Sequence, residues 1–348
     1  MSELRQNLAT GDWVVVAPER LKGKPLQSEP NPTMDVHPTY DESCPFCPPN
    51  EPRFPHVELA REPHPDGESP AAPWITRAIE NKYKIFQPRS EPLPVDARGG
   101  YEREGIYAKV AAEGSHELVL ESPIHNRTFA TMSHREVEAV VDAYLGRFRA
   151  LRQIPGNLLT ILFKNHGPKA GASQLHPHGQ ILSSRLVPNF VRYLLEEATR
   201  YFDAHGRCVF CTMIDYEREQ GARVVYENER FIGYVPYAQP VPYEMHLTPK
   251  KHDSLFEDMS ATEAADFADC LRACLGKLYD ALSNPDFNLI LRNPPHALSH
   301  VPFYHWYLQV VPHTRAPGGF ERGSRIMVNV VSPEAAAKHL REVSAPDG

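Results

Sequence analysis

Residues 176–182, His-Pro-His-Gly-Gln-Ile-Leu, have a counterpart in residues 305–311, His-Trp-Tyr-Leu-Gln-Val-Val. Upstream of each stretch lies an apolar run that is typical of a β-strand, residues 158–163 in the first case and 287–291 in the second. The same features in the same order at similar spacing indicate an internal duplication.

Each strand-like run is preceded by a predicted helix with a marked beginning. Ser133 is followed three residues later by Glu136, and Ser260 by Glu263, which is the capping-box pattern. Apolar residues recur at helical spacing after each box, so each helix is expected to bury one face. A histidine lies eight residues before each serine, and a Cys-x-x-Cys pair lies further upstream in each half. The whole order of cysteines, histidine, helix, strand and histidine therefore occurs twice.

This organisation predicts an α+β protein built of two fused repeats, each an antiparallel sheet with helices and one zinc site. The first repeat is expected over residues 1–190 and the second over 191–348. A helix near 189–204 that stops at Gly206 is predicted to join them.

The duplicated cysteines and histidines predict two metal sites. Two thiolates and two imidazoles make a soft tetrahedral set that suits Zn²⁺, although Fe²⁺ fits a similar shell and stays open for the second site. The alternative is that the thiols are buried core residues and the histidines are scattered over the surface. Cys270 and Cys274 lie on the apolar stripe of the second helix and are interpreted as core. The first predicted ligand set is Cys44, Cys47, His125 and His176, and the second is Cys208, Cys211, His252 and His305.

One residue breaks the symmetry of the repeat. Where the first half has His178, the second has Tyr307. A neutral imidazole is a good nucleophile at pH 7, so His178 is the candidate for attack on the α-phosphorus of a nucleoside diphosphate compound. Such a reaction needs hydrogen-bond donors around the phosphate. Ser173, Gln180, Asn165 and the small-residue turn at Gly171 could supply them, although ordinary turn or surface roles would also explain these residues.

The motif at 176–180 resembles the active-site motif of the galactose-1-phosphate uridylyltransferases, a branch of the histidine-triad superfamily. Residues 11–20, 80–83, 122–125, 165–167 and 171–173 are similar to that family as well. The resemblance implies a pair of fused histidine-triad folds, UDP-glucose and galactose 1-phosphate as substrates, and transfer of UMP through His178. It also implies a homodimer. By position, Arg20, Asn81, Asn165, Gly171, Ser173 and Gln180 match nucleotide and phosphate contacts of the family, and Glu321 matches a hexose contact.

Two departures keep other activities open. Residues 20–25 read Arg-Leu-Lys-Gly-Lys-Pro, in which a lysine replaces the second arginine of the family pattern and offers no bidentate fork to a phosphate. After Glu321, residues 323–329 differ from the uridylyltransferase run and are more similar to the plant ADP-glucose phosphorylases. The alternatives are an ADP-sugar phosphorylase that uses inorganic phosphate, and a zinc-stabilised nucleotide-binding module without catalysis.

Composition excludes several other classes of protein. The formal net charge of −7 comes without a basic stripe, so nucleic acid is not an expected partner. No apolar run is long enough to span a bilayer, and the N-terminus lacks the apolar centre of a signal peptide. A cytoplasmic protein without membrane contact is therefore expected, in which thiols stay reduced and free to bind metal.

Overall fold

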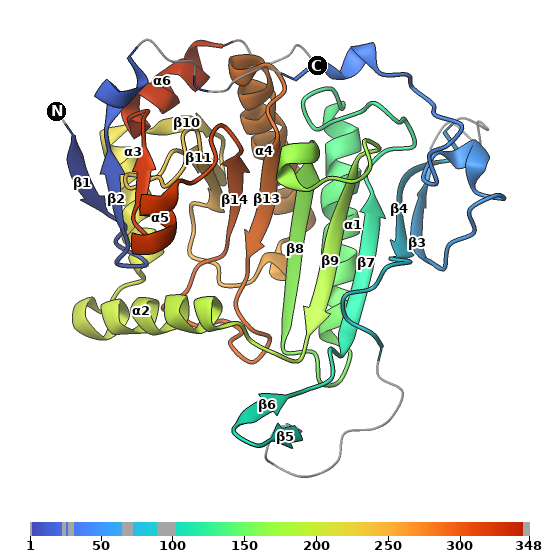
Figure 1. Cartoon of the computed structure of the whole chain (residues 1–348), viewed down its shortest axis with the longest axis horizontal. Helices are drawn as coiled ribbons and strands as arrows, with labels where there is room; N and C mark the ends of the chain where they lie inside the picture. Colours follow the sequence, from blue (N-terminus) through green and yellow to red (C-terminus); the bar gives the residue numbers. More distant parts are fainter. Residues whose placement is uncertain (1, 23–25, 27–30, 65–71, 89–101, 344–348) are drawn as a thin grey trace.

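A ten-stranded sheet runs through the whole molecule and carries strands from both halves of the sequence (Figure 1). The computed structural model describes residues 2–22, 26, 31–64, 72–88 and 102–343. The strand order is β10-β11-β12-β14-β13-β8-β9-β7-β4-β3. The first five strands in that order are β10 (Val224–Glu227), β11 (Phe231–Tyr234), β12 (Met245–Pro249), β14 (Tyr307–Pro312) and β13 (Phe287–Arg292). The other five are β8 (Leu159–His166), β9 (His178–Ser184), β7 (Gly114–Leu120), β4 (Trp74–Glu80) and β3 (Glu58–Pro63).

The two halves meet at the seam between β8 and β13, which pair antiparallel. Phe163 of β8 lies opposite Gln180 of β9, and Ile290 of β13 lies opposite Gln309 of β14. Phe163 and Ile290 are themselves paired across the seam. The two repeats are thus related by an approximate two-fold axis at this pair, and the predicted α+β fold of two fused antiparallel units is confirmed. The boundary at residue 190 stays a proposal.

The two predicted capped helices cover one face of the sheet. They are α1 (His134–Arg152) and α4 (Ala261–Leu282), and both capping boxes form. Their apolar stripes pack on inward-facing strand residues such as Ile181 and Leu308 to make the main core. Cys270 and Cys274 are fully buried in that core, as predicted, and Gly233 leaves the space for the Cys274 sulfur.

The opposite face is partly covered by α2 (Asn189–His205) and α3 (Val209–Gln220). The linking helix α2 ends where predicted, at Gly206, whose φ of 67° suits glycine. A second sheet joins both ends of the chain in the order β1 (Glu3–Gln6), β2 (Trp13–Val16) and β15 (Met327–Asn329). The remaining elements are the hairpin β5 (Glu102–Glu104) and β6 (Tyr107–Lys109), the helices α5 (Gly319–Ser324) and α6 (Pro333–Glu342), and the 3₁₀ turns η1 (Pro18–Leu21), η2 (Met34–Val36), η3 (Pro48–Asn50), η4 (Pro168–Ala170) and η5 (Phe256–Asp258).

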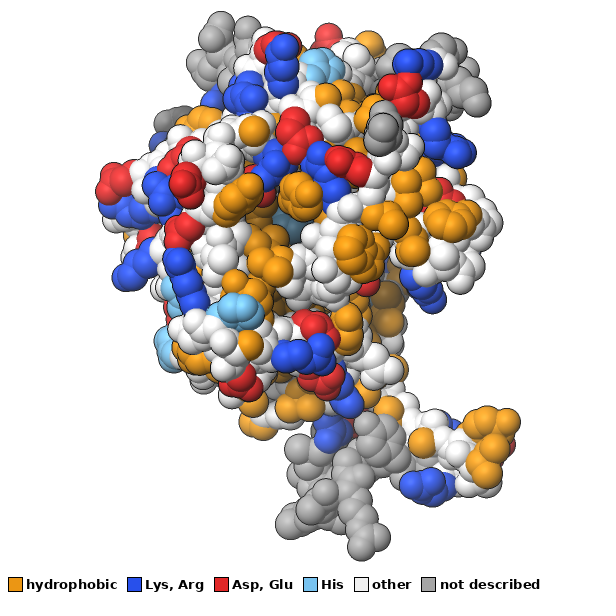
Figure 2. All heavy atoms as spheres, turned by 90° about the vertical axis from the view of Figure 1, so that its left-hand side faces the viewer, with side chains coloured by type: hydrophobic (Ala, Val, Ile, Leu, Met, Phe, Trp, Pro, Cys, Tyr) orange, Lys and Arg blue, Asp and Glu red, His pale blue; other side chains and the backbone are white. Residues whose placement is uncertain are grey.

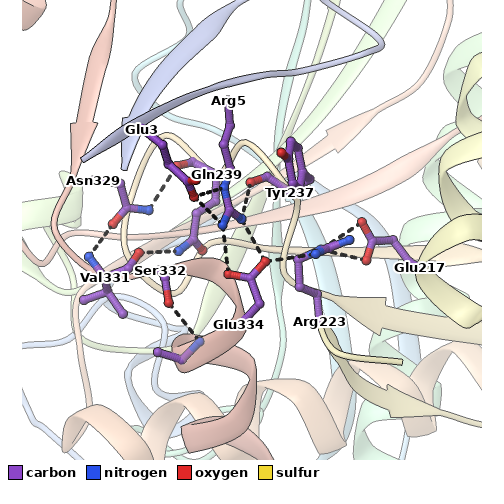
Figure 3. A network of polar contacts seen from close by, with 11 residues as sticks. Glu3, Arg5, Glu217, Arg223, Tyr237, Gln239, Asn329, Val331, Ser332 and Glu334 are labelled. Atoms are coloured by element: carbon purple, nitrogen blue, oxygen red, sulfur yellow. Dashed lines mark hydrogen bonds and ion pairs between the residues drawn. The ribbon is translucent and has the colours of Figure 1, made fainter. Parts of the chain in front are cut away.

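A network of buried and partly buried ion pairs links β1 of this second sheet to the second half (Figure 3). Glu334 of α6 accepts from Arg5 of β1 at 2.8 Å and from Arg223 at 2.9 Å. Arg223 also contacts Glu217 of α3 at 2.9 Å, and both of those side chains are buried. The pairs therefore link α3, at whose beginning the second cysteine pair lies, to α6 and through it to β1.

One face of the molecule exposes many large hydrophobic side chains. Figure 2 shows hydrophobic atoms gathered around a hollow on the side that carries β1 and α2. Trp13, Phe190, Tyr193 and Tyr216 are each exposed by between 42% and 54%. None of the described helices is both long enough and apolar enough to cross a membrane.

Candidate active site and metal centres

The first predicted ligand set comes together as one buried cluster. Cys44, Cys47, His125 and His176 each offer one ligand atom within 4.8 Å of the others. Cys47 Sγ lies 3.5 Å from His125 Nδ1 and 3.7 Å from His176 Nδ1. The cysteines lie just before η3, His125 lies between β7 and α1, and His176 lies directly before β9. The cluster therefore joins three separate segments of the first half.

The outer nitrogen of the His176 ligand ring is fixed by the backbone. His176 Nε2 lies 2.8 Å from the carbonyl oxygen of Ser122, which can only accept a hydrogen bond, so Nε2 carries the proton. The lone pair of Nδ1 is then left to face the thiols. A backbone carbonyl behind the ligand imidazole is the arrangement that zinc sites use to set the tautomer.

The second predicted set assembles in the same way, although less tightly. Cys208, Cys211 and His252 form a group within 4.8 Å. The fourth predicted ligand, His305, lies outside this group, but its Nδ1 is 3.6 Å from Cys211 Sγ. His305 Nε2 lies 3.0 Å from the carbonyl of Pro249. This contact corresponds to the one between His176 Nε2 and the carbonyl of Ser122 in the first half. Both sets offer the soft donors that Zn²⁺ prefers.

His178 begins β9 and lies beside the first cluster. Its ring centre is 5.5 Å from that of Phe46, which lies between the two cysteines of the first pair. Nδ1 lies 2.8 Å from the carbonyl oxygen of His176 and so carries the ring proton. Among the described residues, no hydrogen-bond partner occupies Nε2, so its lone pair is available. Burial and the charge of Lys164 lower the pKa of His178 to about 4, which keeps the ring neutral at pH 7.

A buried polar triad lies behind His178, on the helix-covered side of the sheet. Glu121 accepts from Tyr144 of α1 and from Lys164 of β8, each at 2.5 Å. Lys164 also lies 3.4 Å from the carbonyl oxygen of His178. Gly179 makes room for this arrangement, because a Cβ there would lie 2.3 Å from the Tyr144 hydroxyl. The glycine of the motif is therefore explained by packing on α1.

Removal of one member of this ion pair is expected to destabilise the protein strongly. Lys164→Met leaves Glu121 charged and buried, and breaking such a pair costs about 3–5 kcal/mol of unfolding free energy. The double variant Glu121→Gln, Lys164→Met is expected to recover most of the loss, because no buried charge remains. Urea denaturation measures both. A loss below about 1 kcal/mol in the single variant, or no recovery in the double, would contradict the expectation.

On the open face of the sheet, Gln180 is held by a histidine that the sequence had not singled out. His116 of β7 accepts from the backbone N–H of Ile85 through Nδ1, at 3.2 Å, so its Nε2 carries the proton. That nitrogen donates to Gln180 Oε1 at 2.9 Å. Asn81 Nδ2, which is itself a donor, lies 3.0 Å from the same nitrogen and makes no hydrogen bond to it in this tautomer. Gln180 and Asn81 thus both lie beside His116, and their roles as nucleotide contacts stay a prediction. His116 lies on a different strand and in no motif, which is why the sequence carries no signal for it.

The predicted phosphate-binding residues lie above β8. Asn165 and Ser173 line one pocket of about 300 Å³ together with His176. Gly171 follows η4 with a φ of 90°, and a Cβ at that position would lie 3.5 Å from Asn165 Nδ2. The structure therefore groups Asn165, Gly171 and Ser173 beside the loop that leads into His178.

Arg20 and Glu321 do not join this group within one chain. Arg20 is exposed in η1, next to the β1–β2–β15 sheet. Glu321 lies in α5, where its carboxylate accepts from the backbone N–H of Gly318 at 3.0 Å. Figure 1 shows α5 on the second-half side of the sheet, whereas β9 lies on the other side of β13 and β8.

The counterpart of the His178 site in the second half is filled. Tyr307 is buried in an apolar cluster with residues of α2 and α3, including Leu194 and Phe210. Its ring centre is 5.6 Å from that of Phe210. Tyr307 is therefore a core side chain.

Comparisons with known proteins agree with this geometry. Residues 1–188 match the sequence model described as galactose-1-phosphate uridyl transferase, N-terminal domain. The chain is 31% identical to an ADP-glucose phosphorylase of Arabidopsis thaliana, with 98% of the chain and 93% of the relative covered. It is 28% identical to a galactose-1-phosphate uridylyltransferase of Thermotoga maritima, with 98% of each covered. The crystal structure of an Arabidopsis thaliana ADP-glucose phosphorylase with bound ADP-glucose is similar, with a TM-score of 0.79, 28% identity and coverage of 99% and 100%.

Proposed function

The chain belongs to the galactose-1-phosphate uridylyltransferase family, and we propose that it transfers a nucleoside monophosphate between two phosphorylated compounds through a covalent bond to His178. The observation that carries the proposal is the hydrogen bonding of the His178 ring, which leaves one nitrogen free to act as a nucleophile. Its Nδ1 donates to the His176 carbonyl and its Nε2 keeps a free lone pair, beside a cluster of two cysteines and two histidines that could hold a metal ion.

The reaction has two steps, each an exchange at the same phosphorus. His178 Nε2 attacks the α-phosphorus of a nucleoside diphosphate sugar, the P–N bond forms, and the bond from this phosphorus to the bridging oxygen breaks. The sugar 1-phosphate leaves with that electron pair. A phosphate oxygen of the acceptor then attacks the same phosphorus and the P–N bond breaks, which restores the free imidazole.

Amide groups and a hydroxyl around the site are proposed to stabilise charge on the phosphoryl oxygens. Gln180 Oε1 is taken up by His116, so the NH₂ group of Gln180 is left to donate. Asn165, Gly171 and Ser173 lie at the neighbouring pocket and loop. We assign Ser173 and Gln180 to catalysis, and Arg20, Asn81, Asn165, Gly171 and Glu321 to substrate binding. Positioned donors of this kind lower the barrier of phosphoryl transfer.

We assign zinc to both cysteine–histidine sets, with iron as the other metal that the second could hold. A structural zinc ion supplies a rigid tetrahedral link between distant segments. In the first half, His125 and His176 are the imidazole ligands, and the backbone between His176 and His178 then carries that rigidity to the nucleophile.

Two donors fit this proposal. The first is UDP-glucose, with UMP passed to galactose 1-phosphate. The second is an ADP-sugar, with inorganic phosphate as the acceptor. The second candidate is favoured by the 31% identity over nearly the whole chain to a plant ADP-glucose phosphorylase.

Intact-mass spectrometry of the protein mixed with each donor, without acceptor, tests the proposal. We expect the mass to rise by one UMP from UDP-glucose or by one AMP from ADP-glucose, and the addition to disappear when the matching acceptor is supplied. The better-labelled donor identifies the nucleotide. No mass gain with either donor would instead support the non-catalytic nucleotide-binding module.

A homodimer forms part of the proposal, because it gives Glu321 a role. Within one chain α5 lies on the second-half side of the sheet and His178 on the first-half side. A hexose bound at His178 could meet Glu321 only from a partner subunit. The hydrophobic atoms gathered around the hollow in Figure 2, on the side that carries β1 and α2, offer apolar surface for such an assembly.

A further inference from the structure

We infer that Asn288 and His313, both from the second half, are positioning residues that turn the Asn165 amide so that its NH₂ group faces the phosphate. The inference rests on the proposed function and adds a residue pair to its phosphate site. The three side chains form a line across the seam between β8 and β13. His313 Nε2 lies 2.6 Å from Asn288 Oδ1, and Asn288 Nδ2 lies 2.8 Å from Asn165 Oδ1.

A backbone carbonyl fixes the direction of every bond in this line. The nitrogen of Asn288 also lies 3.0 Å from the carbonyl oxygen of Ala170, which can only accept. The atom of Asn288 that faces Ala170 must therefore be the NH₂ group, and its oxygen must face His313. The same NH₂ group then meets the oxygen of Asn165, because two donors would repel each other.

The consequence for Asn165 is that its oxygen is occupied and its nitrogen is free to donate. Asn165 Nδ2 lies 3.4 Å from the carbonyl of Gly171, which is too long for a strong hydrogen bond. It faces the loop after η4 at the pocket that also holds Ser173. The Asn288 bond to Ala170 holds the end of η4, from which that loop continues. The Asn288 side chain therefore orients the Asn165 amide and also fixes the backbone beside it.

The repeat supplies an internal comparison. Phe163 of β8 is paired with Gln180 of β9, so two residues further along the antiparallel strands Asn165 lies at the level of His178. The corresponding pair in the second half is Arg292 with Tyr307. In the second half Arg292 instead donates to Gln309, at 3.0 Å and 2.7 Å. The amide line is thus found on the side of the seam that carries the nucleophile.

Asn288→Asp is the sharpest test, because a carboxylate of nearly the same shape can only accept. Asn165 is then expected to turn its NH₂ group toward the new carboxylate and its oxygen toward the phosphate. We expect the single-turnover rate of His178 nucleotidylation to fall about 10²-fold, as for the loss of one donor to a transition state. His313→Leu is expected to cost about tenfold, as for one hydrogen bond. His313→Gln, whose amide nitrogen can replace Nε2, is expected to restore most of the rate.

Thr160→Val is the matched control. Thr160 also lies on β8 and also bonds a second-half histidine across the seam, His296 at 2.9 Å, but at the opposite end of the strand. We expect this variant to keep the wild-type labelling rate, although its melting temperature falls by about as much as that of the Asn288 and His313 variants.

The outcomes separate the two proposals. If UDP-glucose and ADP-glucose both fail to label the wild type, the proposed function is overturned and this inference with it. If the wild type is labelled and Asn288→Asp is labelled equally fast, only the positioning role is overturned. Equal losses in Asn288→Asp and Thr160→Val would overturn it as well, because the effect would then come from the seam in general.

Discussion

Replacement of His178 by alanine is expected to abolish nucleotidylation and to lower turnover by about 10⁴-fold or more, in the range found when a covalent nucleophile is removed. The reason is chemical, since the other imidazole of the motif at 176–180 has both ring nitrogens engaged. His176 cannot take over, because its Nδ1 faces Cys47 and its Nε2 is bonded to Ser122. Intact mass with UDP-glucose and ADP-glucose, and steady-state rates with each acceptor, measure the effect.

The duplication supplies the control for this variant. Tyr307→Phe changes the residue at the matching position of the second half, which is buried against Phe210 in an apolar cluster. We expect it to keep labelling and turnover near the wild-type level. Retention of turnover by His178→Ala, or an equal loss in Tyr307→Phe, would disprove a covalent role that is confined to the first half.

The sequence predicted those parts of the fold that are encoded locally. The capping boxes at Ser133 and Ser260 gave two correct helix beginnings, because the pattern needs only residues three positions apart. Gly206 gave the end of α2 for the same reason. The joining of both repeats into one sheet could not be predicted, since pairing of β8 with β13 depends on contacts between residues more than 100 positions apart.

The same distinction applies to the site. The metal-type clusters were found because two cysteines and two histidines recur at matched offsets in each half. His116 and Lys164 were missed as site residues, because each contacts the motif at 176–180 from a strand that is distant in the sequence, and the pairing of those strands could not be predicted.

Replacement of Cys47 by serine is expected to remove the first metal ion and to slow nucleotidylation of His178 by at least about 10²-fold, as a misplacement of about 1 Å near reacting atoms can do. Cys47 Sγ lies within 3.7 Å of both histidines of the set. Its loss breaks the link between the loop before η3, the turn before α1 and the start of β9. The neighbouring Cys44 thiol and the two imidazoles lower the pKa of Cys47, which favours the thiolate that binds metal.

Cys211→Ser is the equivalent change in the second half, where Cys211 lies 3.3 Å from His252 and 3.6 Å from His305. Elemental analysis is expected to give about two metal ions per wild-type chain and about one in each variant, with four protein ligands filling each shell. Labelling should separate the variants, because the residue that follows His305 by two positions is Tyr307 and not a nucleophile. Cys211→Ser is therefore expected to lose stability but to keep a labelling rate near that of the wild type at low temperature. If both variants lost labelling equally while remaining folded, the first metal would not position His178. If neither lost metal, the cysteines would be ordinary core thiols.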